Sequence, residues 1–375
     1  MILHAIRAIY NTNLGVTAGE KVLVFTDLPS PSENVDTTDS CRRDGLRYIS
    51  LLTAEVGRSF TKKITYKEYP ALGSHGTEPP EEIWEAAFGK PVIHELRKKG
   101  LFSLLLKKEL TDSGIKEAED ILKKSMPNAV GAVIALSNYS TSHTRFRDFL
   151  TRLCGCRYAS MPLFDVSMLE GSMHVDWKTL AKRTKALEKI VNQALHVEIA
   201  TPNGTRLRLS KEGRKALSDT GILTKKGAFG NLPAGEVFVA PLEGTAEGKL
   251  VLQWAPTREL TEPVTLTVKK GKVVDIAGKE SFADILRAKL AERDGNRNIA
   301  ELGIGTNPRA RKPDNILESE KILGTIHIAL GDNSSFGGKV KTPFHQDFVF
   351  FKPTVTLLSG EGDRIKILDK GVALF

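Results

Sequence analysis

The sequence lacks long hydrophobic runs and a recognisable leader, and these absences exclude two classes of protein. No apolar run reaches the ~18 residues that a membrane-spanning helix needs. The first residues, Met1 to Arg7, have no basic segment ahead of an apolar stretch and no small-residue cleavage site. We therefore expect a cytoplasmic protein with no membrane partner.

Cysteine is also scarce. The three cysteines, Cys41, Cys154 and Cys156, cannot all form pairs. The spacing of Cys154 and Cys156 is neither that of a standard zinc pair nor that of a redox CxxC motif. Because disulfides are rare in the cytosol, we interpret all three as buried or bystander thiols.

The usual signatures of nucleotide and nucleic-acid binding are missing. The sequence has neither GxGxxG nor GxxxxGK[ST], so the common phosphate-binding loops are absent. The net charge is +9, yet the lysines and arginines are scattered through helical stretches such as residues 178–189. Nucleic-acid binders instead gather basic residues in one patch. We expect no nucleic-acid partner, and a basic surface that steers anionic substrates is an open alternative.

The chain is long enough for two hydrophobic cores, and its first half has the pattern of an α/β domain. It has 375 residues, 41% of them hydrophobic and 26% charged. Strands are predicted over residues 21–27, 65–69 and 131–136, and a helix over 41–56. Strands that alternate with helices form parallel sheets. We predict an N-terminal α/β domain with a parallel sheet over residues 1–190.

From residue 196 onward, short strands dominate. Residues 196–200 and 206–209 flank a Pro-Asn-Gly turn and predict a hairpin. Asp176 is predicted to cap a helix over 177–194, and Ser281 a helix over 281–293. Further strands are predicted over 249–254, 264–268 and 272–276. We predict an α+β metal-binding domain over residues 191–375.

The most informative stretch is residues 324–350, where two predicted strands flank a glycine-rich loop. His327 lies in the apolar run 325–330, and His345 and Asp347 share one face of the strand 345–350, because strand side chains alternate. Two imidazoles and a carboxylate suit zinc, cobalt, manganese or ferrous iron. The alternative is a core histidine beside an ion pair at the edge of a loop.

Two upstream motifs each add a glutamate beside turn-forming residues. Glu236 lies in NLPAGEVF, at the start of a predicted strand, and Glu301 lies in ELGIGTNP. Together with the two histidines and Asp347, the glutamates give five donors. That number exceeds what one tetrahedral structural metal uses and suits two metals that share a bridging carboxylate.

Four sequence blocks in this order resemble a known family. NLPAGEVF, ELGIGTNP, EKILGTIHIALG and the final H-x-D are similar to the signature blocks of the thermophilic metalloaminopeptidases, the aminopeptidase T and aminopeptidase S group. The resemblance implies an N-terminal α/β domain, a catalytic C-terminal domain, a homodimer and a two-metal exopeptidase centre. Position by position, it places the metal ligands at Glu236, Glu301, His327, His345 and Asp347.

One position departs from this family. Its members usually carry a tyrosine seven residues after the first histidine, where this chain has Ser334. A serine hydroxyl is too short and too weakly acidic to replace a phenol that reaches a metal or an oxyanion. The resemblance therefore implies an intact metal site with weakened catalysis.

The first functional hypothesis is a metalloaminopeptidase that acts on peptide substrates. Two divalent ions of zinc, cobalt or manganese would activate a bridging water and bind the free α-amine of the substrate. Glu236 and Glu301 are the candidates for the general base, and the sequence leaves open which of them bridges the metals.

Two other hypotheses remain open. His327, His345 and Asp347 alone match the pattern of two histidines and one carboxylate of non-haem iron oxygenases, and some ring-cleaving dihydroxypyridine dioxygenases resemble the same fold family. The third hypothesis is a metal-binding homologue that has lost catalysis. Metal analysis separates the three, since they predict two divalent ions, one iron, or metal without turnover.

Overall fold

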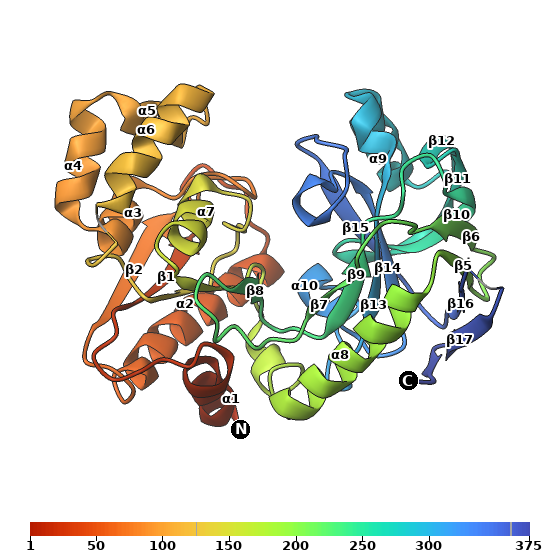
Figure 1. Cartoon of the computed structure of the whole chain (residues 1–375), viewed down its shortest axis with the longest axis horizontal. Coiled ribbons are helices and arrows are strands. Elements are labelled where there is room, and N and C mark those ends of the chain that lie inside the picture. Colours follow the sequence, from red (N-terminus) through yellow and green to blue (C-terminus); the bar gives the residue numbers. More distant parts are fainter. Residues whose placement is uncertain (125, 361) are drawn as a thin grey trace. The chain divides into compact units, whose positions relative to one another are not determined.

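The computed structural model describes residues 1–124, 126–360 and 362–375. These residues form two compact units, and each is described by itself (Figure 1). Unit 1 consists of Met1–His174 and Gly221–Pro233, and unit 2 of Val175–Thr220 and Ala234–Phe375. The two predicted domains, residues 1–190 and 191–375, are a statement about independent folding, which compact units do not establish. That division stays a prediction.

Unit 1 is built on a five-stranded parallel sheet, sheet A, with the strand order β2-β1-β3-β4-β8. The parallel sheet predicted for the N-terminal half is therefore confirmed. Its strands are β1 (Val22–Leu28), β2 (Ile64–Pro70), β3 (Ala132–Ala135), β4 (Arg157–Ser160) and β8 (Phe229–Asn231).

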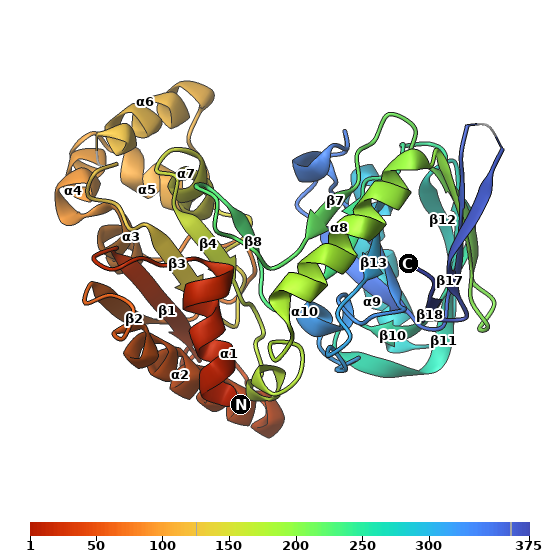
Figure 2. The same ribbon diagram turned by 60° about the horizontal axis from the view of Figure 1, so that its bottom comes forward.

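Helices cover both faces of sheet A (Figure 2). The helix α2 packs against β1 and β2 on one face, and α3 to α7 surround the buried Trp84 on the other. The helix α2 begins at Thr37, ahead of the predicted Cys41, because the Asp36 carboxylate accepts the Asp39 N–H as an N-cap. The helical segments are α1 (Ile2–Ala8), η1 (Ile9–Asn13), α2 (Thr37–Gly57), α3 (Glu81–Phe88), α4 (Lys90–Lys98), α5 (Leu101–Leu106), α6 (Asp112–Lys123), α7 (Arg145–Arg152) and η2 (Val166–Leu169).

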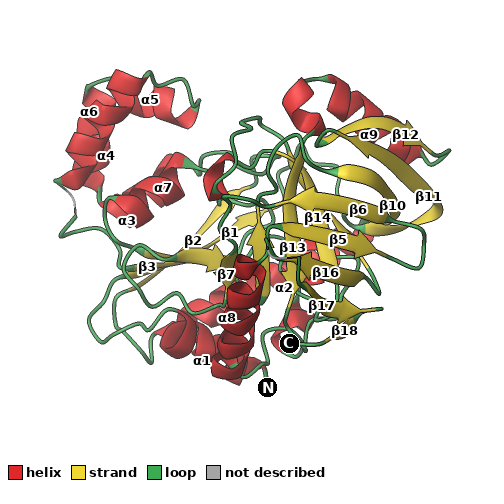
Figure 3. Ribbon diagram, turned by 45° about the vertical axis from the view of Figure 1, so that its right-hand side comes forward, coloured by secondary structure: helices red, strands yellow, loops and turns green. Residues whose placement is uncertain are grey.

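Unit 2 contains two sheets whose paired strands are antiparallel (Figure 3). The eight-stranded sheet B has the order β12-β11-β10-β6-β5-β16-β17-β18, and the five-stranded sheet C the order β15-β14-β13-β9-β7. The predicted hairpin of β5 and β6 is confirmed. Sheet B consists of β5 (His196–Ala200), β6 (Arg206–Ser210), β10 (Glu247–Ala255), β11 (Arg258–Lys269), β12 (Lys272–Ala277), β16 (Thr354–Leu358), β17 (Arg364–Asp369) and β18 (Val372–Ala373). Sheet C consists of β7 (Leu217–Asp219), β9 (Glu236–Val239), β13 (Ile299–Gly305), β14 (Ile326–Gly331) and β15 (His345–Phe350).

The helices of unit 2 confirm one predicted cap and correct the other. The Asp176 carboxylate accepts the backbone N–H groups of Lys178 and Thr179 at the start of α8, as predicted. Ser281 lies inside α9, where Glu280 takes the cap position without a side-chain cap bond. The helical segments are α8 (Trp177–Gln193), α9 (Ser281–Ala291), η3 (Asp294–Arg297), α10 (Ile316–Ser319) and η4 (Ser334–Phe336).

Sheets B and C share one hydrophobic core. Leu302, Ile328 and Phe348 lie opposite one another on one face of sheet C and are all buried in this core. The opposite face of sheet C is thereby left to polar side chains, because strand side chains alternate. Among the described residues, no helix combines the length and apolarity needed to cross a membrane.

Candidate metal centre

The five sequence-predicted donors come from four neighbouring strands of sheet C. Strands β9, β13, β14 and β15 lie side by side, and each contributes at least one donor. The strand register puts Glu301 opposite Ala329 and Ala329 opposite Asp347, and it puts His327 opposite Gly303. All the donors therefore project from the face of sheet C that is turned away from the core. They are Glu236, Glu301, His327, His345 and Asp347.

Glycines in β13 make room for the donors. A Cβ atom on Gly303 would lie 1.9 Å from Cε1 of the His327 ring, so the imidazole can rest against the strand only because this position is glycine. Gly303 and Gly305 were predicted to let the backbone come close to what Glu301 holds, and both lie within strand β13. Because glycine has no side chain, the His327 ring can lie against Gly303 and the carbonyl oxygen of Ile322 against Gly305.

Three of the donors converge. One ligand atom from each of Glu301, His345 and Asp347 lies within 4.8 Å of the others. The Nε2 atom of His345 is 3.4 Å from Oε2 of Glu301 and 3.5 Å from Oδ2 of Asp347. The Nδ1–H of His345 donates to the carbonyl oxygen of Asp332 at 2.7 Å, which leaves Nε2 free as an acceptor. This arrangement prepares His345 to bind a metal through Nε2.

His327 lies on the other side of Glu301. Its Nε2 atom is 3.4 Å from Oε1 of Glu301 and 3.6 Å from Oε2 of Glu236. His327 and Glu236 are buried, with 1% and 7% of their surfaces exposed. Within the described residues, Nδ1 of His327 and Oε2 of Glu236 have no hydrogen-bond partner. A buried polar atom without a hydrogen bond lowers the stability of the fold, and a ligand that binds to it would offset that loss.

A residue that the sequence analysis missed completes the cluster. The fully buried Lys321 donates from Nζ to Oε1 of Glu236 at 2.6 Å and to Oε2 of Glu320 at 2.9 Å. The Glu-Lys pair opens the block EKILGTIHIALG, but an adjacent acid and base are typical of solvated surfaces. Nothing local in the sequence indicated that this pair is buried.

The charges of the cluster are strongly coupled. Burial lowers the pKa of His327, but the hydrogen bond with Glu301 and the nearby carboxylates outweigh burial and raise the pKa to about 9. Burial raises the pKa of Asp347, but His345 outweighs it and holds the pKa well below its usual value. For Glu320, burial dominates and raises the pKa to about 7. Burial lowers the pKa of His345, but the carboxylates, chiefly Asp347, outweigh burial and raise that pKa as well. Protonated imidazoles therefore offset the carboxylates, and a bound metal ion would take the place of these protons.

Ser334 does not lie among the donors. It is exposed at the start of η4, where its hydroxyl donates to Oδ1 of Asp332 at 3.0 Å. The aromatic side chain of this turn is Phe336, whose ring stands edge-on to His345 with the centroids 6.1 Å apart. Phe238 contacts Phe336 in turn at 5.7 Å. An aromatic wall thus stands next to the donor His345.

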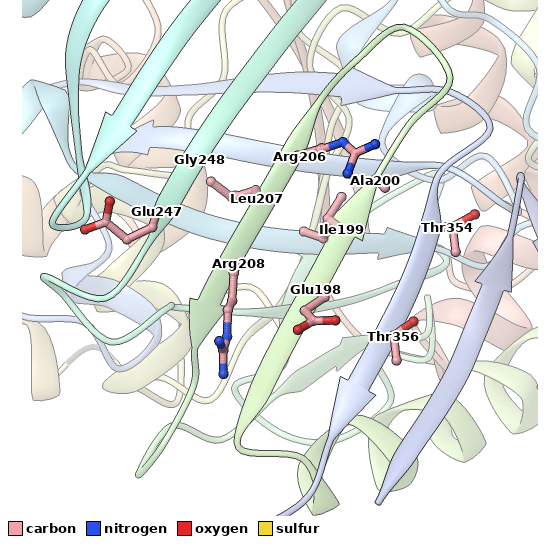
Figure 4. Close-up of a pocket in the computed structure, with 10 residues that line it drawn as sticks. All are labelled: Glu198, Ile199, Ala200, Arg206, Leu207, Arg208, Glu247, Gly248, Thr354 and Thr356. Atoms are coloured by element: carbon pink, nitrogen blue, oxygen red, sulfur yellow. The ribbon is translucent and has the colours of Figure 1, made fainter. Parts of the chain in front are cut away.

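A hollow of about 380 Å³ lies on a different surface of unit 2 (Figure 4). It opens on the outer face of sheet B, where Arg206, Arg208 and Glu198 alternate with core residues. None of the five donors lines it. The hollow is therefore separate from the metal-ligating cluster.

Comparisons with known proteins identify the family. A family model described as NicX, 2,5-dihydroxypyridine 5,6-dioxygenase, matches residues 172–373, more than half of the chain. A curated 2,5-dihydroxypyridine 5,6-dioxygenase from Pseudomonas putida KT2440 is 28% identical over 182 residues, which are 44% of this chain and 52% of that protein. The match thus spans about half the length of the relative.

Two solved structures share the fold. The 2,5-dihydroxypyridine dioxygenase of Pseudomonas putida KT2440 aligns with a TM-score of 0.69 at 18% identity and covers 100% of this chain and 96% of that one. Wild-type AmpT from Thermus thermophilus aligns with a TM-score of 0.57 at 14% identity. The alignment covers 100% of this chain and 99% of AmpT. At these identities the alignments establish the mixed α/β fold alone, and that fold was predicted correctly.

The comparisons correct the predicted activity. The aminopeptidase hypothesis, with its hydrolase chemistry and peptide substrates, is wrong, because the family model and the curated relative are dioxygenases. The resemblance to aminopeptidase T extends to the fold, as AmpT shows, and no further. Metal binding is supported by the convergence of Glu301, His345 and Asp347, whereas two ions of zinc, cobalt or manganese are not. The matched segment contains the whole donor cluster, and the chain belongs to the NicX family, described as 2,5-dihydroxypyridine 5,6-dioxygenase.

Proposed function

We propose that this protein is a ring-cleaving dioxygenase that acts on a dihydroxylated pyridine or a closely related ring. One observation carries the proposal: the segment that matches the family model, residues 172–373, contains every donor of the cluster. The proposal corresponds to the second of the three hypotheses raised by the sequence. It assigns one divalent ion to Glu301, His345 and Asp347.

The donor set fits ferrous iron. Imidazole suits iron and carboxylates suit hard divalent cations, and the converging group has one histidine and two carboxylates where the usual non-haem iron triad has two histidines and one carboxylate. Here Glu301 takes part in the converging group, which the sequence-based triad of His327, His345 and Asp347 did not include. The Nε2 atom of His345 is free to bind, because Nδ1–H is engaged by Asp332.

The overall reaction of the class inserts both atoms of O₂ into the ring and breaks one ring bond. A ferrous ion supplies the one-electron chemistry with O₂ that the ring and the side chains lack. The contribution of this chain is to bind the ion, to orient the ring and to control protons. Each task can be assigned to described side chains.

Proton control is assigned to His327. Its Nε2 atom lies between the carboxylates of Glu301 and Glu236, which stabilise a proton at that atom. A ring hydroxyl that loses its proton on binding would pass it to a base within hydrogen-bond reach. His327 adjoins the converging group through Glu301, so we propose that it exchanges this proton.

Ring orientation is assigned to the aromatic wall. Phe336 stands edge-on to His345 with an interplanar angle of 90°, and Phe238 packs against Phe336. Aromatic rings favour edge-to-face and offset-stacked neighbours. A planar substrate ring would therefore pack against Phe336 while its hydroxyl groups face the donors.

The test is oxygen consumption by the full chain, reconstituted anaerobically with ferrous iron and then mixed with 2,5-dihydroxypyridine. We expect uptake of O₂, loss of the ring absorbance and incorporation of both atoms of ¹⁸O₂ into the product. His345→Ala and Asp347→Asn are expected to lose at least ~10² of the turnover, and the exposed Lys269→Met serves as the control. Iron-loaded protein that consumes no O₂ with any dihydroxypyridine or dihydroxybenzene would support the hypothesis of a metal-binding homologue without catalysis instead.

A further inference from the structure

The lysine in the donor cluster is the feature that the proposed function leaves unexplained. Lys321 has none of its surface exposed, and its Nζ atom bonds Glu236 and Glu320. Lysine is almost never fully buried unless it is paired, because removing an ammonium from water is costly. A buried ammonium beside a metal-ligating group therefore calls for an explanation in terms of charge.

The backbone around Lys321 is held firmly against sheet C. The N–H of Asn307 donates to the carbonyl oxygen of Lys321 at 2.8 Å, and Asn307 pairs with Ile322 in a short parallel bridge. A Cβ atom on Gly305 would lie 2.1 Å from the carbonyl oxygen of Ile322. The glycine at the end of β13 thus admits this segment to the place from which Lys321 reaches Glu236.

The cations and carboxylates follow one another in a row. Lys321 Nζ lies 2.6 Å from Oε1 of Glu236, whose other oxygen lies 3.6 Å from Nε2 of His327. The same nitrogen of His327 lies 3.4 Å from Glu301, which belongs to the converging group. One end of the row can therefore hold a metal ion, while the ammonium is fixed at the other end.

We propose that the Lys321 ammonium takes the place of a second metal ion and so restricts the centre to one ion. This inference deepens the proposed function and rests on it for the presence of the metal. A second divalent ion at Glu236 would lie within a few ångströms of a fixed positive charge, with little water between them to screen the repulsion. Glu236 then acts as the counter-ion of Lys321 and the partner of His327, and it does not ligate the ion.

The test removes the ammonium and counts ions. Full-length wild type and Lys321→Met are equilibrated with Mn²⁺ under anaerobic conditions, and bound metal is measured by plasma mass spectrometry and isothermal titration calorimetry. We expect about one ion per chain in wild type and about two in Lys321→Met, with an electron paramagnetic resonance spectrum of two coupled ions in the variant. A single ion in folded Lys321→Met, or two in wild type, would overturn the proposal.

Matched variants separate this role from simple structural pairing. The double variant Lys321→Met with Glu236→Gln lacks the carboxylate that the second ion needs, so it should return to about one ion. Lys269→Met removes an exposed lysine and should keep the wild-type count. If the ammonium only stabilises the fold, Lys321→Met will be less stable and gain no ion, which contradicts the proposal.

If Lys321→Met does not fold, Mn²⁺ binding by the single variant Glu236→Gln tests the proposal instead. The proposal expects the single ion to be retained with an unchanged electron paramagnetic resonance spectrum of bound Mn²⁺, because Glu236 supplies no ligand atom, whereas loss of an oxygen ligand would empty the site or alter that spectrum. Such a loss would show that Glu236 holds the ion, and the proposal would fail. If the wild type binds two ions and cleaves the ring, this inference fails and the proposed function holds. If it binds one ion and does not cleave the ring, the proposed function fails and this inference holds.

Discussion

At the scale of single residues, Gly303 determines where His327 can lie. The imidazole rests on the backbone of β13, and Nε2 of the ring would be 2.0 Å from a Cβ atom at position 303. Strand β13 is paired on both sides, so the ring has to move and the strand stays in place. A methyl group at this position should therefore displace His327 from Glu301.

We expect Gly303→Ala to weaken metal binding by about 10- to 100-fold, the range seen when a group that orients a ligand is lost. It should also destabilise the protein by about 1–3 kcal/mol through overpacking. Calorimetric titration with Mn²⁺ and urea denaturation measure the two effects. Gly360→Ala is the control, since its added methyl group would meet only the flexible end of Leu195. Wild-type metal affinity in Gly303→Ala would show that the centre does not depend on the position of His327.

His75 in unit 1 makes a prediction about pH. Its Nδ1 atom accepts the backbone N–H of Ser140 at 3.0 Å, and partial loss of hydration lowers the pKa of the ring although the residue as a whole is exposed. A lowered folded-state pKa means that the fold favours the neutral ring. The stabilisation is then complete above the ordinary pKa of histidine and is lost as the pH falls through the lower folded-state pKa.

Wild type should therefore lose more stability between pH 7.5 and pH 5 than His75→Asn, whose amide oxygen can accept the same N–H without titrating in this range. Urea unfolding at the two pH values gives the comparison. Equal losses in both proteins would mean that His75 is not a source of acid sensitivity.

At the scale of elements, the sequence predicted strands well wherever one face is polar. Strands β5 and β15 have the predicted bounds. Buried residues alternate along β5, whereas β15 changes from three polar to three buried apolar residues. Strand β13 is buried along its whole length, so its sequence lacks the alternation that would have predicted a strand. The helices between Glu81 and Leu106 were not predicted.

The same limit applies to the site. The two histidines, Asp347 and both glutamates could be found because motifs mark them, and the structure brings them to one face of sheet C. Lys321 could not be found, because its burial depends on long-range packing against Asn307 and Glu236. The activity was misjudged for a related reason: motifs shared across a fold family specify donors better than they specify reactions.

The helix α8 offers a prediction at this scale. The Asp176 carboxylate caps its first turn by accepting two backbone N–H groups and the hydroxyl of Thr179. We expect Asp176→Ala to lower the free energy of unfolding by about 1 kcal/mol, and Asp176→Asn, which can still cap, by less. Chemical denaturation followed by circular dichroism measures both values. Equal losses in the two variants would assign the effect to charge and exclude capping as its cause.

At the scale of the whole molecule, each unit joins segments that are distant in the sequence. Strand β8 extends sheet A of unit 1 from Phe229–Asn231, after the chain has already entered unit 2. A cut after residue 190 would therefore separate β8 from its sheet. The homodimer implied by the aminopeptidase resemblance stays a prediction.

The pairing of β5 with β16 has a consequence for how the protein is made. Thr354 pairs with Ala200, and Leu358 with His196, so β5 pairs with a strand that is translated much later than itself. Until that neighbour leaves the ribosome, one edge of β5 is unpaired and open to other nascent chains. Contacts so distant in the sequence also slow folding. Unit 2 therefore cannot complete sheet B or assemble the donors of its metal centre until β15 and β16 have been translated.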